Sequence, residues 1–158
     1  MEKTVFSEAV RQYQKQLLVI AFHYCGNRQD AEDLVQDVFL KLYTHPLPPK
    51  GAHLRNWLIR ATINRCKNHL HSGHHRLRAP MEAAEQVLEE PDLTRQAIWD
   101  AITALPQIYR EVVVLYYYSG YTTAEIGRLL HRKPATVQSQ LMRARSMLKD
   151  QLKEVWEE

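Results

Sequence analysis

The fold is decided by residues 121–152, which run YTTAEIGRLLHRKPATVQSQLMRARSMLKDQL. Thr122 and Glu125 have the spacing of a capping box, in which each side chain satisfies a backbone N–H at the start of a helix. Pro134 suits the first turn of a second helix, because its fixed φ is helical and an N–H there would have no partner. Residues 131–133 lie between the two helices and form the predicted turn. The stretch therefore predicts a helix-turn-helix.

The second helix of this motif has one apolar stripe, whose members follow at intervals of four, three and four residues. They are Val137, Leu141, Ala144 and Leu148. The outer face near the helix start carries polar and flexible side chains that suit base edges and phosphates in a DNA major groove. The candidates for this contact are Lys133, Thr136, Gln138, Ser139, Met142 and Arg143. An ordinary helical hairpin with a polar exterior has the same pattern, so the pattern leaves both interpretations open.

The rest of the chain also predicts helices. Apolar residues recur at spacings of three and four, and no stretch alternates as a strand would, so the expected fold class is all-α. The expected helices cover about residues 4–24, 30–43, 54–71, 92–105 and 106–119. The third is expected to bury one stripe, made of Leu54, Trp57, Leu58 and Ala61. Prolines and a glycine between residues 44 and 53 predict a loop before it.

A composition change divides the chain into two parts. From Ser72 to Asp92 apolar residues become sparse, and Gly73, Pro80 and Pro91 interrupt any helix. The sequence therefore predicts two small helical modules with a flexible linker between them. Their expected limits are residues 1–78 for the first module, 79–92 for the linker and 93–158 for the second module.

Charge is distributed unevenly along the chain. Residues 45–79 carry seven Lys or Arg and no acid, whereas residues 80–104 carry one basic and six acidic residues. A plain solvated surface normally mixes the two signs, so the acid-free block indicates contact with a polyanion such as nucleic acid. The block also contains His69, His71, His74 and His75, which could form a metal site or a titratable basic patch. We expect the basic patch and no metal.

Several classes of protein are disfavoured. No apolar run approaches the ~18 to 20 residues that span a bilayer, and the N-terminus lacks a signal-peptide pattern, so we expect a cytoplasmic protein. Cys25 and Cys66 are 41 positions apart and neither belongs to a CxxC pair, which favours buried, unreactive thiols. There is no glycine-rich phosphate loop and no nucleophile–base pair, so we expect neither an enzyme nor a cofactor.

Three segments resemble the extracytoplasmic-function sigma factors of bacterial RNA polymerase. Residues 30–39, DAEDLVQDVF, are similar to the segment with which that family binds the polymerase clamp. Residues 54–76 are similar to the segment that opens and recognises the −10 promoter element. Leu105-Pro106, residues 109–112, residues 120–126 and the pattern from Thr136 to Arg145 resemble the module that recognises the −35 element. The resemblance covers nearly the whole chain in the family's order.

The resemblance implies an alternative sigma factor, which directs core polymerase to a restricted set of promoters. It implies contact with the β′ clamp and the β flap of polymerase, with promoter DNA and with an anti-sigma partner. The implied polymerase-binding residues are Asp30, Asp33, Gln36, Asp37, Phe39 and Leu40. The implied −10 residues are Arg60, Asn64, Lys67, Asn68, His71 and Arg76, and the −35 residues are the six candidates of the helix-turn-helix. Asn64, Asn68 and the proline-rich loop are candidates to hold unstacked bases.

Four positions depart from the family pattern. Gln138 and Gln140 stand where the family often has Lys or Arg. Lys133 stands where a Ser or Thr would cap the helix, and His131 replaces a common Gly in the turn. These departures put the promoter sequence in doubt. Two rival functions also remain: a helix-turn-helix regulator that acts without polymerase, and a protein-interaction adaptor whose basic block binds a partner.

Overall fold

The computed structural model describes residues 1–71 and 93–156, and within these ranges it contains helices, turns and bends but no strand. The all-α prediction is therefore confirmed. The chain divides into two compact units, Met1–Leu88 and Glu89–Glu158. The predicted linker, residues 79–92, lies outside the described residues, as do Arg76 and two of the clustered histidines, His74 and His75.

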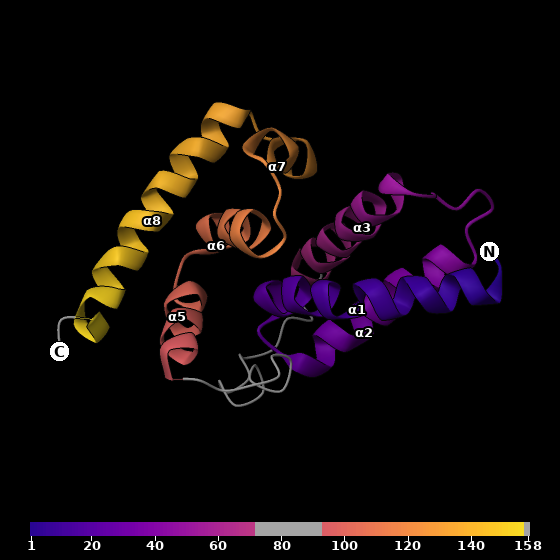
Figure 1. The fold of residues 1–158 in the computed structure, drawn as a ribbon, viewed down its shortest axis with the longest axis horizontal. Helices are drawn as coiled ribbons and strands as arrows, with labels where there is room; N and C mark the ends of the chain where they lie inside the picture. The colour runs from indigo at the N-terminus through magenta and orange to yellow at the C-terminus, as the bar shows by residue number, and fades with distance from the viewer. Residues whose placement is uncertain (72–92, 157–158) are drawn as a thin grey trace. The chain divides into compact units, whose positions relative to one another are not determined.

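The first unit contains three helices, α1 (Lys3–Cys25), α2 (Arg28–Tyr43) and α3 (Ala52–His71). All three pack against one another, and α1 and α2 run side by side in Figure 1. Gly26 ends α1 in the left-handed conformation, with φ of 69°, and its N–H donates to the carbonyl of Phe22 at 2.8 Å. Asn27 then caps α2, because its side chain accepts from the N–H of Asp30 at 3.2 Å.

The core of this unit differs from the sequence prediction in α3. The residues that α3 buries are Leu58, Ile59, Thr62, Ile63 and Cys66, whereas Leu54, Trp57 and Ala61 are only half-buried. The predicted inward stripe is therefore wrong except at Leu58. Thr62 can lie in the core because its hydroxyl donates to the carbonyl of Leu58 at 2.8 Å, so its polar group needs no other partner.

The two cysteines of the chain lie in this core. Cys25, at the end of α1, and Cys66, in α3, both have 0% exposure and are free thiols. A hydrogen bond with Cys25 and burial raise the pKa of the Cys66 thiol. A thiol with a raised pKa has little of the reactive thiolate form at neutral pH. The structure therefore agrees with the prediction of buried, unreactive cysteines.

The second unit is built around α8 (Pro134–Trp156). This helix packs against α5 (Leu93–Thr103), α6 (Gln107–Val113) and α7 (Thr123–Leu130), as the ribbon in Figure 1 shows. The largest fully buried side chains of this unit include Val112 of α6, Ile126 of α7 and Leu141 of α8. Leu115, which follows α6, is also among them. The helix predicted over 106–119 is present but changes form, because Val114–Tyr118 is a π-helical turn, η1.

No helix of the described residues has both the length and the apolar character needed to cross a membrane.

Candidate functional site

The helix-turn-helix predicted from the sequence is present in the second unit. The side chain of Thr122 accepts from the N–H of Glu125 at 3.1 Å, and the N–H of Thr122 donates to the Glu125 carboxylate at 3.0 Å. This reciprocal capping box fixes the first residue of α7. The turn of residues 131–133 and the start of α8 at Pro134 also agree with the prediction.

The turn closes tightly over α7. His131 adopts the left-handed conformation with φ of 59°, and the N–H of Arg132 donates to the carbonyl of Gly127 at 2.8 Å. A Cβ placed on Gly127 would lie 2.5 Å from the carbonyl oxygen of Arg132. Only glycine therefore allows the backbone of the turn to approach α7 this closely.

Replacing His131 with glycine is expected to stabilise the second unit by about 0.5–1 kcal/mol. A left-handed conformation costs an ordinary L-residue about 1–2 kcal/mol, and the added flexibility of glycine in the unfolded chain offsets only about 0.4–1 kcal/mol of that gain. Urea denaturation of the full chain, followed at the amides of α7, measures the change. The matched control is Ala124→Gly within α7, which is exposed and helical and should lose about 1 kcal/mol. A loss of stability in His131→Gly would contradict the prediction.

The predicted −35 residues lie on the outer face of α8 and in the turn before it. All six candidates, Lys133, Thr136, Gln138, Ser139, Met142 and Arg143, are exposed. Val137, Leu141 and Ala144 are buried on the opposite side of the helix. An exposed polar face near the start of a helix that a tight turn holds in place is the geometry with which helix-turn-helix proteins enter the major groove.

Two polar side chains near this face are directed into the protein instead. Arg132 donates to the side-chain oxygen of Gln140 at 3.0 Å and also pairs with Glu111 of α6. Gln140 is half-buried. The departure from the family pattern at Gln140 therefore affects the interior of the unit and not the exposed face of α8.

Arg145 of α8 contacts aromatic rings, and the sequence patterns do not predict this contact. Arg145 donates to the hydroxyl of Tyr117 at 2.5 Å, and its guanidinium carbon lies 5.7 Å and 5.6 Å from the ring centroids of Tyr116 and Tyr117. The hydrogen bond to Tyr117 raises the pKa of Arg145. The only signal in the sequence was the run of three tyrosines, 116–118, which helical spacing alone does not connect to α8.

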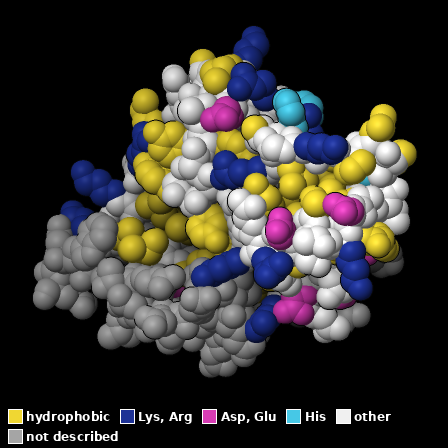
Figure 2. Space-filling view, turned by 45° about the vertical axis from the view of Figure 1, so that its right-hand side comes forward, with side chains coloured by type: hydrophobic (Ala, Val, Ile, Leu, Met, Phe, Trp, Pro, Cys, Tyr) yellow, Lys and Arg dark blue, Asp and Glu magenta, His cyan; other side chains and the backbone are white. Residues whose placement is uncertain are grey.

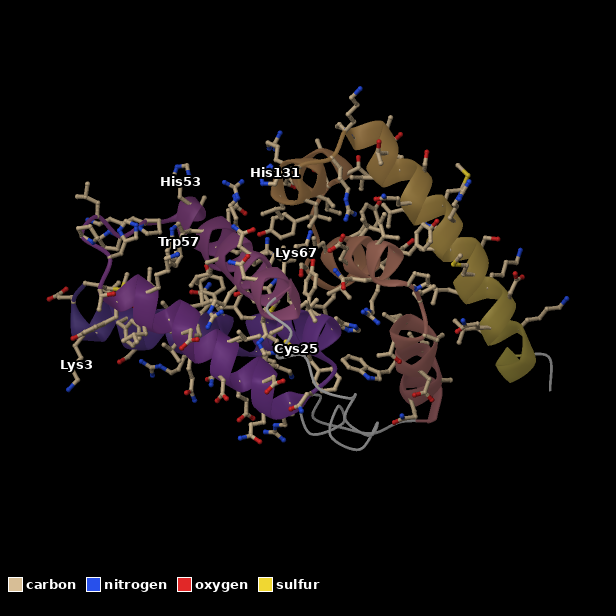
Figure 3. All side chains as sticks on the ribbon, turned by 180° about the vertical axis from the view of Figure 1, so that it is seen from behind. Lys3, Cys25, His53, Trp57, Lys67 and His131 are labelled. Carbon is tan, nitrogen blue, oxygen red and sulfur yellow. The ribbon has the colours of Figure 1, made fainter. Side chains whose placement is uncertain are left out.

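Four of the six predicted −10 residues share one face of α3. Arg60, Asn64 and Asn68 are exposed, and Lys67 is half-buried. They lie opposite the buried residues of α3, and Figure 3 shows Lys67 well along the helix from His53 and Trp57. The side chain of His71 and the whole of Arg76 lie outside the described residues. On the face drawn in Figure 2 the Lys and Arg side chains are interspersed with hydrophobic and neutral ones.

The loop before α3 adds an exposed apolar group to this end of the unit. Leu47 is 83% exposed, and its N–H donates to the ring nitrogen Nδ1 of His45 at 3.0 Å. The His45 ring in turn lies edge-on to Trp57, with ring centroids 5.7 Å apart. The loop is therefore shaped by ring contacts, while Leu47 stays uncovered between Pro46 and Pro48. The prolines predict the loop, but no sequence pattern distinguishes Leu47.

The predicted polymerase-binding residues of α2 fall into two groups. Asp33, Gln36, Asp37 and Leu40 are exposed, and Leu40 is 62% exposed although it is apolar. Phe39 is buried against Phe6 of α1, with ring centroids 6.3 Å apart. Asp30 is largely covered, and its carboxylate oxygen lies 3.5 Å from Nε2 of His69.

Two of these acids connect α2 to α3. Asp37 accepts from Arg65 at 2.9 Å, and Asp30 faces His69. His69, the described member of the histidine cluster whose side chain is placed, therefore contacts a carboxylate of its own unit. Within the described residues no group of three or more His, Cys, Asp or Glu side chains could hold a metal ion.

An apolar groove runs beside the exposed residues of α2. Its walls come from α1, with Val10 and Leu18, and from α2, with Val35, Gln36 and Leu40. Arg28 and Glu32 line the same groove and form an ion pair at 2.7 Å. An uncovered leucine beside an apolar groove with charges at its edge is a surface suited to a protein partner.

Comparison with known proteins assigns both units. A model of sigma-70 region 2 matches residues 9–76, and a model of sigma-70 region 4 matches residues 95–148. The ECF RNA polymerase sigma factor SigE of Mycolicibacterium smegmatis is 31% identical over 157 residues, covering 93% of this chain and 61% of the relative. The RNA polymerase sigma-H factor of Pseudomonas aeruginosa is 25% identical, covering 93% of this chain and 86% of the relative.

A solved structure has the same fold. The sigma factor RpoE of Bartonella quintana, in complex with the anti-sigma factor NepR, superposes with a TM-score of 0.70 at 22% identity, covering 94% of this chain and 96% of that one. Regions 2 and 4 occur in this chain in that order, on the units that carry the exposed faces of α2, α3 and α8. The chain belongs to the extracytoplasmic-function group of the sigma-70 family.

Proposed function

We propose that the chain is an alternative sigma factor, a non-catalytic subunit that binds core RNA polymerase in the cytoplasm and starts transcription at a restricted set of promoters. The observation that carries the proposal is the exposed outer face of α8 on a capped helix-turn-helix in a region 4 unit. In this proposal that face recognises the −35 element. The exposed side of α3 and the loop with Leu47 contact the −10 element.

The proposed contacts with polymerase use both units. The exposed side of α2 around Leu40 binds the β′ clamp. Leu40 is the apolar anchor of this contact, and the nearby acids add charge complementarity. The second unit binds the β flap. An anti-sigma factor is a further proposed partner, supported by the structural relative RpoE, which was solved in complex with the anti-sigma factor NepR.

Run-off transcription tests this function. The full chain is added to purified core RNA polymerase with fragmented DNA from its source organism, and the transcripts are sequenced. Discrete starts that share two upstream elements would establish the proposed function and identify the promoter. Duplex binding without any stimulation of transcription would favour the regulator that acts without polymerase, and the absence of both would favour the adaptor.

Replacing Arg143 with alanine is expected to weaken binding to the −35 element by about 1–3 kcal/mol, which is the range for a guanidinium that contacts a base edge. Arg143 is exposed on the outer face of α8, so the substitution should leave the fold intact. The measurement is the affinity of polymerase holoenzyme for a promoter fragment identified by run-off transcription. Lys149→Ala removes a cation from a later turn of the same helix and should change the affinity little. Equal losses in the two variants would contradict a specific role for Arg143.

A further inference from the structure

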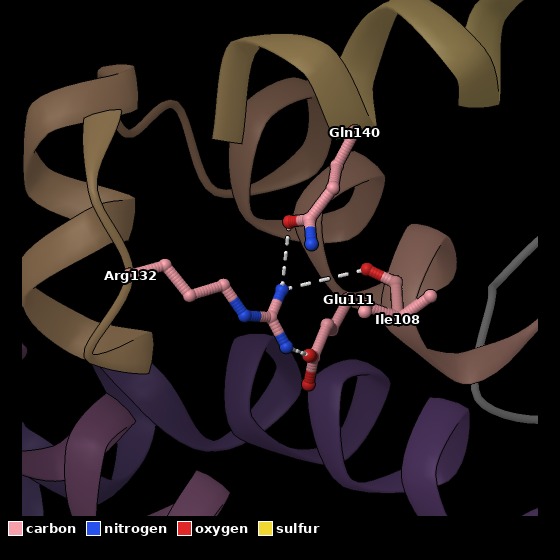
Figure 4. A network of polar contacts seen from close by, with 4 residues as sticks. All are labelled: Ile108, Glu111, Arg132 and Gln140. Atoms are coloured by element: carbon pink, nitrogen blue, oxygen red, sulfur yellow. Dashed lines mark hydrogen bonds and ion pairs between the residues drawn. The ribbon is translucent and has the colours of Figure 1, made fainter. Parts of the chain in front are cut away.

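The turn of the helix-turn-helix carries an arginine that bonds to groups inside the second unit. Arg132 pairs with the carboxylate of Glu111 and donates to the side-chain oxygen of Gln140 at 3.0 Å and to the carbonyl of Ile108 at 3.5 Å (Figure 4). These partners belong to α6 and to α8. One guanidinium thus joins the turn, α6 and the helix with the exposed recognition face.

The anionic partner in this network is buried. The side chain of Glu111 is 3% exposed and that of Arg132 is 17% exposed. A carboxylate so far from water needs an opposite charge and hydrogen bonds close by. Arg110, the residue before Glu111 in α6, donates to the carbonyls of Thr103 and Leu105. The turn supplies a cation to the Glu111 carboxylate through Arg132.

The network acts on the orientation of α8 through Gln140. Gln140 lies on α8 between the buried stripe and the exposed face, and its carbonyl oxygen faces Arg132. A rotation of α8 about its own axis by about 20° would move its Cα atoms by about 0.8 Å, because they lie ~2.3 Å from the axis. The ends of long side chains would move several times farther, beyond the tolerance of hydrogen bonds to base edges.

We propose that Arg132 is a positioning residue for promoter recognition, which fixes the rotation of α8 by clamping Gln140 to the buried Glu111. In this role Arg132 is not a DNA contact, although it is a cation in the turn beside the recognition helix. This inference rests on the proposed recognition of the −35 element by α8.

The test compares promoter discrimination among full-chain variants in polymerase holoenzyme. The measured quantity is the affinity for the promoter fragment identified by run-off transcription, divided by the affinity for the same fragment with its −35 element scrambled. All binding is measured well below the melting temperature of each variant, where a loss of stability alone changes both affinities equally and leaves the ratio unchanged.

Three variants are informative: two single substitutions of Arg132, and one double substitution that moves the cation from the turn to α8. Arg132→Gln is expected to lower the ratio about tenfold with an unchanged salt dependence, since no phosphate contact is lost. Arg132→Gln combined with Gln140→Arg moves the cation from the turn to α8 and should restore the ratio to within about threefold, because coupled neighbours are not additive. Arg132→Lys keeps the charge beside Glu111 but lacks the guanidinium fork, so it should fold and still lose discrimination about threefold or more.

Other results would overturn the proposal. If Arg132→Gln weakens both fragments equally and the slope of log affinity against log salt falls by about one, Arg132 is a phosphate contact. If Arg132→Lys folds and keeps the full ratio, the bond to Gln140 does not position α8; this variant decides the matter even where Arg132→Gln fails to fold. The wild-type ratio distinguishes a failure of the positioning role of Arg132 from a failure of the proposed −35 recognition. A wild-type ratio of one would refute the −35 recognition itself.

Discussion

Leu40→Asp is expected to weaken the complex with core RNA polymerase by at least about 2 kcal/mol, or about 30-fold, while the first unit keeps its stability. Leu40 is 62% exposed on α2 beside the apolar groove, so a polar side chain there disturbs no core. In a protein interface the same position would place a carboxylate where an apolar anchor is needed. Titration of labelled chain with core polymerase measures the loss, and far-UV circular dichroism checks the fold.

The matched control for Leu40→Asp is Lys41→Gln. Both substitutions make α2 more negative by one charge, and Lys41 is the exposed neighbour of Leu40. Successive helical residues point about 100° apart, so Lys41 faces away from the groove. Lys41→Gln should therefore bind polymerase nearly as well as the wild type. Similar losses in both variants would mean that net charge, and not the leucine, governs binding.

Leu141→Ala is expected to destabilise the second unit by about 2–5 kcal/mol, the usual range when a buried leucine leaves a cavity. Leu141 is 1% exposed on the inner side of α8, opposite the proposed recognition face. Because a small helical domain has only about 5–15 kcal/mol of total stability, this loss removes a large share of it. Hydrogen exchange in the full chain should show faster exchange at the amides of α7 and α8 and unchanged exchange in α1 to α3.

Met142→Ala is the control for Leu141→Ala. Met142 is the next residue of α8 but is 68% exposed, so its truncation should change stability by less than about 0.5 kcal/mol. The pair therefore separates packing from helix propensity at nearly the same position. A large loss in Met142→Ala, or a small one in Leu141→Ala, would contradict the assignment of the inner and outer faces of α8.

The local elements of this fold could be predicted because short-range chemistry specifies them. The capping box of Thr122 and Glu125, the glycine after α1 and Pro134 at the start of α8 each act within a few residues. The exposed face of α8 followed from periodicity alone. These features depend on neighbours in the sequence, which the sequence displays directly.

The errors and omissions have equally physical causes. The predicted buried side of α3 was wrong because Thr62 is a polar residue in the sequence. In the structure its hydroxyl donates to the carbonyl of Leu58, so Thr62 can lie in the core with Ile59 and Ile63. Glu111 lies 21 positions from Arg132, and Tyr117 lies 28 positions from Arg145, so only the packed unit brings these side chains together. The π-helical turn of Val114–Tyr118 has no pattern that distinguishes it from an α-helix.

The position of the two thiols gives the first unit a natural reporter of its own opening. The chain has two cysteines, both in the α1–α3 core with no exposure, so an alkylating reagent can modify them only after this core opens. The second unit contains no cysteine, so its opening does not change the rate of thiol modification. The rate of thiol modification in the unaltered protein, with and without polymerase, therefore measures how far binding suppresses the opening of one unit alone.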